Sequence, residues 1–193
     1  MRLYLVLGAD DAHVLDPALR GGVDVVQLRA KEATDREIVR AARAFRIACR
    51  RHRALFILND RPDLVERCGA DGVHVGRSDA SVAEAREIVG PERLVGISVS
   101  TFEELQDVEG ADYAGVTAFA TPTKTDAVAG GLELIRDAAA ALTIPWVAIG
   151  GIDLGNVADV VAAGAPGIAV VRAIRDAEDP EAAARELRAA LDR

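Results

Sequence analysis

The sequence predicts an α/β fold: one compact (β/α)8 TIM barrel that spans residues 1–193. Short runs rich in β-branched residues alternate along the chain with longer amphipathic segments rich in Ala, Leu, Arg and Glu. The short runs number eight, and most are continuously apolar, which is typical of parallel strands buried on both faces. A doubly wound sheet is the competing fold, but the first run leads into Gly8-Ala9-Asp10, and no Gly-rich dinucleotide loop follows it.

The eight apolar runs are the predicted strands. Units of about 24 residues make a compact barrel, since the usual size range of this fold begins near about 200 residues. In chain order the predicted strands are Leu3–Leu7, Val23–Leu28, Leu55–Leu58, Gly72–Val75, Leu94–Ile97, Tyr113–Thr117, Trp146–Ile149 and Gly167–Val171.

Amphipathic segments between these runs are predicted helices. Good N-caps precede three of them, at Thr34 or Asp35, at Ser81, and at Asp179 before Pro180. The tripeptide Gly-Ala-Asp or Gly-Ala-Pro recurs at 69–71, 110–112 and 164–166, which indicates a repeated helix-to-strand connection. The predicted helices are Asp35–Arg51, Ser81–Val89, Leu132–Leu142, Asn156–Ala163 and Pro180–Leu191.

Composition narrows the function classes. The chain carries 23 Lys and Arg against 31 Asp and Glu, a net charge of −8, which argues against nucleic-acid binding. The basic run 50–53 closes a predicted helix and is interpreted as a solvated helix end. No apolar run has the length of a membrane span or the form of a signal peptide, and Cys49 and Cys68 are interpreted as reduced core thiols, so we expect a cytoplasmic protein.

Polar residues gather where the predicted strands end. In a (β/α)8 barrel the active site forms at the carboxyl ends of the strands. From the second strand to the eighth, these positions hold Gln27, Arg29 and Lys31; Asn59 and Asp60; His74 and Asp79; Ser98; Thr121, Thr123 and Lys124; Gly150 and Gly151; and Val171 and Arg172.

Gln27, Arg29 and Lys31 stand two residues apart, so in an extended segment their side chains share one side. Two cations and an amide suit an anion with many oxygens. The alternative is a surface ion pair with Glu32 or Asp35.

Asp60 and Asp79 follow neighbouring strands, and such a pair suits Mg²⁺ bound together with substrate phosphate oxygens. The alternatives are that Asp60 caps the turn before Arg61-Pro62 and that Asp79 is a loop or cap residue near Ser81.

Two further segments suit phosphate. Thr121-Pro122-Thr123-Lys124 offers two hydroxyls and an ammonium, and the segment 125–130 has the composition of a loop that closes over a ligand. Gly150-Gly151 and the backbone at Val171-Arg172 match the phosphate site that barrels build after strands seven and eight.

Few groups suit proton or covalent chemistry. Ser98 has no evident His or Asp partner in the sequence, so acyl transfer is not indicated, and His74 reads as readily as a structural histidine as a catalytic one. Groups that hold charge dominate, as a transfer reaction with a pyrophosphate leaving group requires.

Seven motifs in order resemble the thiamin phosphate synthase family over nearly the whole chain. They are Gln27-Leu28-Arg29-Ala30-Lys31, Asn59-Asp60-Arg61, Gly72-Val73-His74-Val75-Gly76 with Asp79, Gly96-Ile97-Ser98, Thr121-Pro122-Thr123-Lys124, Ala148-Ile149-Gly150-Gly151-Ile152 and Val170-Val171-Arg172-Ala173-Ile174.

The resemblance implies a condensation of hydroxymethylpyrimidine pyrophosphate with thiazole phosphate to thiamin monophosphate and pyrophosphate. It implies that pyrophosphate departs first and that the thiazole nitrogen captures the resulting pyrimidine-stabilised cation. By similarity, Asp60 and Asp79 hold Mg²⁺, and Gly151 with the Val171-Arg172 backbone takes the thiazole phosphate. The pyrimidine pyrophosphate falls to Gln27, Arg29, Lys31, Asn59, Ser98, Thr121, Thr123 and Lys124, of which Arg29, Lys31, Ser98 and Lys124 are the expected catalytic residues.

One stretch departs from the family pattern, because 115–120 lacks the usual Gly-Pro and is one residue short. Two other functions stay open: a thiazole tautomerase on the same barrel, which typically loses parts of the pyrophosphate set that this sequence keeps, and a non-catalytic binder of thiamin phosphates. Small barrels of this kind commonly dimerise, so a homodimer is compatible with the sequence.

Overall fold

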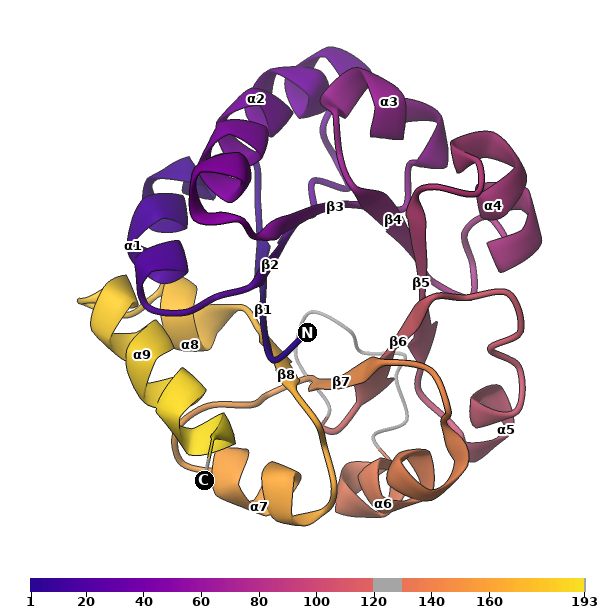
Figure 1. The fold of residues 1–193 in the computed structure, drawn as a ribbon, viewed down its shortest axis with the longest axis vertical. Coiled ribbons are helices and arrows are strands. Elements are labelled where there is room, and N and C mark those ends of the chain that lie inside the picture. Colours follow the sequence, from indigo (N-terminus) through magenta and orange to yellow (C-terminus); the bar gives the residue numbers. More distant parts are fainter. Residues whose placement is uncertain (120–129, 193) are drawn as a thin grey trace.

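The computed structural model describes residues 1–119 and 130–192 and contains a closed barrel of eight parallel strands in chain order. A ring of helices surrounds the strands (Figure 1). The strands are β1 Leu3–Leu7, β2 Val25–Leu28, β3 Leu55–Asn59, β4 Gly72–Val75, β5 Leu94–Val99, β6 Tyr113–Thr117, β7 Trp146–Ile149 and β8 Ile168–Val170.

The helices between the strands are α1 Leu15–Arg20, α2 Asp35–His52, α3 Val65–Cys68, α4 Val82–Val89, α5 Phe102–Leu105, α6 Gly131–Ala141, α7 Val157–Ala162, α8 Arg172–Arg175 and α9 Pro180–Leu191, with 3-10 helices η1 Asp11–Val14 and η2 Pro62–Leu64. The predicted barrel is confirmed, and its strand boundaries agree to within two residues. Thr34, Ser81 and Asp179 each cap the helix predicted for them. The short helices α1, α3, α5 and α8 were not predicted, and the last three have only four residues each, too few to show a helical period.

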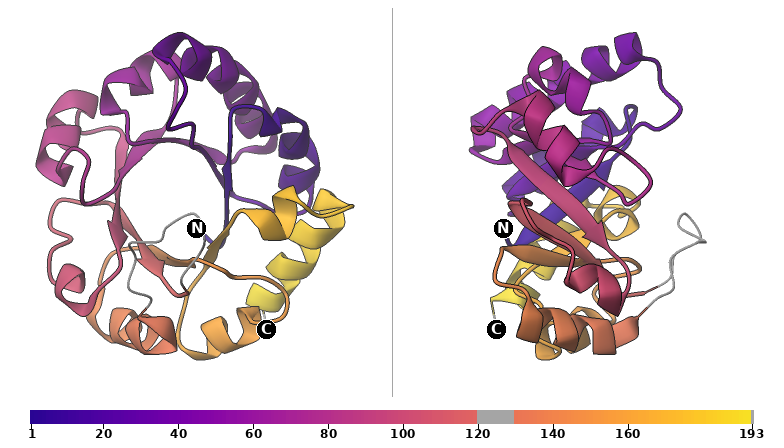
Figure 2. Two further views of the ribbon diagram at one scale, coloured as in Figure 1. Left: turned by 180° about the vertical axis from the view of Figure 1, so that it is seen from behind. Right: turned by 90° about the vertical axis from the view of Figure 1, so that its right-hand side faces the viewer.

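Pairing between β1 and β8 closes the barrel, with Leu3 opposite Ile168. The last helix, α9, lies against α1, as the adjoining yellow and indigo helices show (Figures 1 and 2). A Cβ on Gly21 of this contact would lie 2.4 Å from the backbone oxygen of Glu181, so only glycine permits the two helices to approach so closely.

The strands are buried on both faces, which explains their continuous apolar runs. Outward residues such as Leu5, Phe56 and Val73 pack against the helices. Inward residues fill the barrel and form a separate cluster of Tyr4, Val6, Val25, Ile57, Tyr113, Val147 and Ala169.

The repeated Gly-Ala-Asp tripeptide has a clear structural role. Asp71, which precedes β4, accepts the backbone N–H of Phe56 in β3 at 2.8 Å, and Asp112, which precedes β6, accepts that of Val95 in β5 at 2.7 Å. Asp24 serves the start of β1 in the same way through the N–H of Arg2. Each carboxylate thus satisfies an amide at the edge where the preceding strand begins.

The basic run 50–53 ends α2 as predicted, and Arg53 takes a left-handed conformation there. Arg51 and His52 both contact Asp16, which ties α2 to α1. Cys49 and Cys68 are buried free thiols, in keeping with the prediction. Within the described residues, no helix is both long and apolar enough to cross a membrane.

Gly96 makes room for Tyr113 in the barrel interior. The two residues are register partners, and a Cβ on Gly96 would lie 2.1 Å from Cζ of that fully buried ring. We therefore expect Gly96→Ala to destabilise the protein by about 1–3 kcal/mol, the usual cost of overpacking a core. Urea unfolding measures this change. Gly115→Ala is the matched control, because its Cβ would meet His74 at an ordinary 3.4 Å. An equal loss in both variants would contradict this packing argument.

Candidate active site

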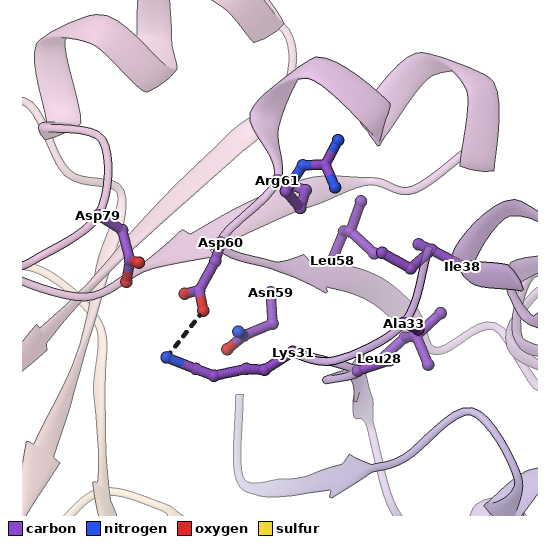
Figure 3. Close-up of a pocket in the computed structure, with 10 residues that line it drawn as sticks. Leu28, Lys31, Ala33, Ile38, Leu58, Asn59, Asp60, Arg61 and Asp79 are labelled. Atoms are coloured by element: carbon purple, nitrogen blue, oxygen red, sulfur yellow. Dashed lines mark ion pairs between the residues drawn. The ribbon is translucent and has the colours of Figure 1, made fainter. Parts of the chain in front are cut away.

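A cavity of about 260 Å³ opens at the carboxyl ends of β2, β3 and β4. Figure 3 shows the side chains that line it, with Asp60, Asn59 and Lys31 clustered and Asp79 facing Asp60 from the other side. The lining residues are Leu28, Ala30, Lys31, Ala33, Ile38, Leu58, Asn59, Asp60, Arg61 and Asp79. The structure therefore brings together four of the residues predicted for the site.

Lys31 forms an ion pair with Asp60, with 3.2 Å between Nζ and Oδ2 (Figure 3). The alternative pairing with Glu32 or Asp35 is wrong, because Asp35 instead binds Arg61 at 2.7 Å. Arg61 also holds Asp63, and this hydrogen bonding lowers the pKa of both of its carboxyl partners. Arg61 also lines the cavity, but Asp35 and Asp63 balance its charge. The Lys31 ammonium instead pairs with Asp60 inside the cavity.

The backbone of Asp60 has a left-handed conformation, with φ of 61°. Its N–H donates to the carbonyl of His74 at 2.8 Å, which continues the β3–β4 pairing for one residue beyond the strand. Asp60 makes no cap for η2, so that alternative is wrong. A non-glycine residue in this conformation is uncommon and marks a constrained position.

Asp79 has a structural role as well as its place in the cavity. Its Oδ2 accepts the N–H of Gly76 at 3.0 Å and closes a tight turn after β4. A Cβ at Gly76 would lie 2.7 Å from that oxygen, so a larger residue there would displace the Asp79 carboxylate. The loop-residue alternative is therefore correct in part, and Ser81 alone caps α4.

The two carboxylates are poorly neutralised. Burial, and then the nearby charge of Asp79, raise the pKa of Asp60, while Lys31 opposes the rise. One ammonium beside two carboxylates leaves room for a hard cation, which would bind through oxygen. Among the residues that the structure describes, no third His, Cys, Asp or Glu completes a metal group. Such a two-carboxylate site fits Mg²⁺, which keeps water and phosphate oxygens as its other ligands.

Arg29 stands next to this cavity without a carboxylate partner in the described part of the chain. Its side chain is half-buried, and its backbone N–H continues the β1–β2 pairing by donating to Leu7 at 2.8 Å. A partly buried, unpaired guanidinium is suited to an anionic ligand.

Ser98 has a histidine partner, which corrects the sequence prediction. Its Oγ lies 3.0 Å from Nε2 of His74. This pair could not be predicted from the sequence, because the two residues are 24 positions apart and meet only through strand register. His74 is opposite Gly96 on β5, so its ring reaches Ser98 two residues further on, on the same inward face.

A hydrogen-bonded chain crosses the barrel from β2 to β5, here called the interior chain. Its members are Gln27, Tyr4, Tyr113, His74 and Ser98. Gln27 Nε2 donates to the Tyr4 hydroxyl at 2.9 Å, and the two phenolic oxygens are 3.1 Å apart. The Tyr113 hydroxyl lies 3.2 Å from Nδ1 of His74. Burial raises the pKa of both phenols far above the usual range, so each keeps its proton.

Tyr4 and Tyr113 are the polar residues that the sequence prediction missed. Each was assigned to a strand, but an aromatic residue in a strand normally signals packing. Alignment of the strands pairs Tyr113 with Gly96, and this large-to-small pairing is the signal that could have found it.

The remaining predicted residues lie after β7 and β8, which are neighbours in the barrel. Gly150 and Gly151 have positive φ values of 105° and 62°, and a Cβ on Gly150 would lie 2.4 Å from the backbone oxygen of Phe119. Asn156 fixes this loop by donating to the Gly151 carbonyl at 2.8 Å. Val171 and Arg172 begin the short helix α8, so amide N–H groups at this end are left without helical partners.

Thr121, Thr123 and Lys124 lie outside the described residues, as do positions 125–129 of the predicted closing loop. Of the shortened stretch 115–120, all but the last residue are described. Residues 115–117 complete β6, and the N–H of Ala118 donates to Ile149 at 2.7 Å.

The raised pKa of Asp60 has a consequence for stability. A folded-state pKa above the unfolded value means that stability is lost as the pH rises through the folded pKa. Without added metal, Asp60→Asn should therefore raise the melting temperature at about pH 7.5, and this gain should shrink as the pH falls towards about pH 4, because a growing share of the wild-type carboxyl is then protonated. Asparagine also tolerates the left-handed backbone.

Calorimetry at both pH values measures the effect. Asp35→Asn is the control of opposite sign, because Arg61 lowers the pKa of Asp35 and the ionised form is favoured in the folded state. A lower melting temperature for Asp60→Asn at neutral pH would show that its carboxylate stabilises the fold instead.

Three comparisons relate this chain and its fold to known proteins. A family model described as thiamine monophosphate synthase matches residues 3–174. Thiamine-phosphate synthase from Thermosynechococcus vestitus is 45% identical over 191 residues, which cover 96% of this chain and 54% of that protein. The Chlorobium luteolum protein of the same name is 45% identical over 197 residues, which cover 98% and 93%. A solved thiamine phosphate pyrophosphorylase from Pyrococcus furiosus matches with a TM-score of 0.91 and 36% identity, over 99% of this chain and 95% of that one.

The chain spans about half the length of the Thermosynechococcus relative and nearly all of the Chlorobium one. Both matches cover almost the whole of this chain, and the family model covers most of it. The chain therefore belongs to the thiamine monophosphate synthase family.

Proposed function

We propose that this barrel condenses hydroxymethylpyrimidine pyrophosphate with thiazole phosphate to give thiamin monophosphate and pyrophosphate. The observation that carries the proposal is the cavity at the ends of β2–β4, where Lys31, Asp60 and Asp79 converge. Membership of the family, and the printed names of its relatives, support the same reaction.

The pyrimidine pyrophosphate lies across β2, β3 and β5 in this proposal. Lys31, Arg29 and Asn59 bind the phosphoryl oxygens with two charges and an amide. Ser98 adds a hydroxyl, and Gln27 recognises the pyrimidine from the interior. By similarity to the family, Thr121, Thr123 and Lys124 complete this pocket, with Lys124 adding a third positive charge.

Asp60 and Asp79 hold Mg²⁺ in this proposal. The ion, when bound, neutralises negative charge on the departing pyrophosphate. A cation held there would also offset the two effects that raise the pKa of Asp60, which are burial and then the charge of Asp79. Asp79 is held by the Gly76 amide and Asp60 by the β3–β4 pairing, so both ligands are preorganised.

The thiazole phosphate binds on the other side of the barrel mouth. Gly151 and the backbone at Val171 and Arg172 offer N–H groups to its phosphate. The proposed reaction requires the thiazole nitrogen to face the carbon that loses pyrophosphate. The residues stabilise charge and fix both partners, and no side chain is required as a base, in agreement with a dissociative order of steps.

A thiazole tautomerase is the second candidate on the same barrel. It needs one phosphorylated substrate and no metal. The retained set of Lys31, Asn59, Asp60 and Asp79 favours the synthase, because a tautomerase has no use for a pyrophosphate and metal site.

Product formation by the purified chain tests the proposal. Both substrates are supplied with and without Mg²⁺, and thiamin monophosphate and pyrophosphate are measured together. We expect equal amounts of the two products, and only with both substrates and metal present. Isomerisation of thiazole phosphate alone would support the tautomerase, and binding without turnover would support a non-catalytic role.

Asp60 separates the two enzymatic candidates. We expect Asp60→Asn to lower kcat by about a hundredfold or more, since a metal-held leaving group loses its main charge stabilisation. Steady-state rates at a series of Mg²⁺ concentrations measure the change. Glu66→Gln is the matched control, because this exposed carboxylate six residues away does not line the cavity. Unchanged turnover in Asp60→Asn would exclude the proposed metal role.

Gly151 tests the second subsite. Its φ of 62° is strained for alanine by about 1 kcal/mol, so Gly151→Ala should displace the local amide groups. We expect the KM for thiazole phosphate to rise about tenfold while the KM for the pyrimidine pyrophosphate stays within about twofold. Gly155→Ala, in the same loop but without a positive φ, is the control. A rise in both KM values would argue against a separate thiazole phosphate site.

A further inference from the structure

The interior chain has a direction, which follows from counting its protons. The amide nitrogen of Gln27 can only donate, so the Tyr4 oxygen accepts from it at 2.9 Å. The Tyr4 proton is then left for the Tyr113 oxygen, 3.1 Å away. The other neighbours of Tyr4 in the interior cluster are apolar, including Val6 and Val25.

The same count continues to the far end. With its oxygen accepting from Tyr4, Tyr113 donates its own proton to Nδ1 of His74 at 3.2 Å. A neutral imidazole whose Nδ1 accepts carries its proton on Nε2. That Nε2–H donates to Oγ of Ser98 at 3.0 Å. The Ser98 hydroxyl proton is therefore available to an acceptor that does not belong to the interior chain.

We propose that the interior chain makes Ser98 a committed hydrogen-bond donor towards an anionic ligand at the ends of the strands, with Tyr4 and Tyr113 as positioning residues. This inference rests on the proposed function, which assigns Ser98 to the pyrophosphate. A hydroxyl that presented a lone pair would repel such an anion, whereas a donor stabilises the charge that develops as pyrophosphate leaves.

The direction of these hydrogen bonds also excludes one role for the Ser98–His74 pair, which is activation of Ser98 as a nucleophile. A histidine that activates a serine must accept the hydroxyl proton on its own nitrogen. Here Nε2 already carries a proton and points it at Ser98. The third member is the Tyr113 phenol, which stays protonated, where a nucleophilic triad has a carboxylate. The distance between the two residues resembles that between a nucleophile and its base, but the hydrogen bond runs from His74 to Ser98 and not the other way.

Strand packing supports a built arrangement. Gly96 leaves space for the Tyr113 ring to cross β5 and reach His74 on β4, since any Cβ there would meet the ring. Gly115 lies opposite Ser98 on β6, and its missing side chain leaves the His74 ring at contact distance, 3.4 Å from the position of a Cβ. Gly96 is therefore the glycine on which the position of the Tyr113 ring depends.

The tautomer of His74 is the first test. In protein with ¹⁵N-labelled histidine, the two ring nitrogen shifts report which atom carries the proton, and His74→Gln assigns the signals among the three histidines. We expect the proton on Nε2 in the wild type, and an increased share on Nδ1 in Tyr113→Phe, where Nδ1 has lost its donor. Protonation on Nδ1 in the wild type, or no change in Tyr113→Phe, would overturn the proposal.

A double-mutant cycle is the second test. Ser98→Ala should lower kcat about a hundredfold, and Tyr113→Phe about fivefold with the KM values within about twofold. If Tyr113 acts through Ser98, the double variant should match Ser98→Ala to within about twofold. A merely structural tyrosine would multiply the two losses, and that result would overturn the proposal.

Tyr4→Phe keeps the experiment decisive if Tyr113→Phe folds poorly. This variant leaves the Tyr113–His74 and His74–Ser98 bonds in place but removes the donor to Tyr113. The loss of kcat that Tyr4→Phe causes on its own should therefore be absent when it is combined with Ser98→Ala. The proposed function and the direction of the interior chain can be refuted separately. A wild-type protein that makes no thiamin monophosphate refutes the proposed function, while the nitrogen shifts still decide the polarity of the chain.

Discussion

The parallel register of the closed barrel is the constraint on which the site depends. Each strand pairs with its neighbour so that His74, Gly96 and Tyr113 lie level on three successive strands. Side chains alternate between the helices and the interior, and a shift of one residue would turn every inward group outward. Tyr4 and Tyr113 meet across 109 positions of sequence for this reason alone. The closure of β1 on β8 fixes the register for the whole ring.

Much of this architecture could be read from the sequence, because the signals are local. Continuous apolar runs predict buried strands, and the caps at Thr34, Ser81 and Asp179 predict helix starts within single turns. The charged residues at the barrel mouth could also be predicted, because the carboxyl ends of the strands in a barrel share one edge. Lys31, Asp60 and Asp79 meet as expected without any knowledge of register.

The parts that the sequence could not predict all depend on which residues face each other across strands. Ser98 was judged to lack a partner because His74 is remote along the chain, and the two phenols were assigned to packing. The role of the Gly-Ala-Asp tripeptide was equally hidden: Asp71 and Asp112 serve the strand before them, not the helix or turn in which they stand. Periodicity gives the face of a residue but not its neighbour.

The charged groups of the candidate site lie at the barrel mouth, whereas the polar residues of the interior include two phenols and an amide. At the mouth, Asp60 stays partly buried beside Asp79 at a cost to stability that a bound cation would remove. In the interior, protonated phenols and an amide carry polarity in place of ionised side chains, which a closed apolar barrel tolerates because both phenols and the amide are hydrogen-bonded. An ionised group in the place of Tyr113 would be costly to bury and would have to be neutralised there. The proposed interior chain only orients the Ser98 hydroxyl. The charges that bind the substrate are supplied by the residues at the barrel mouth.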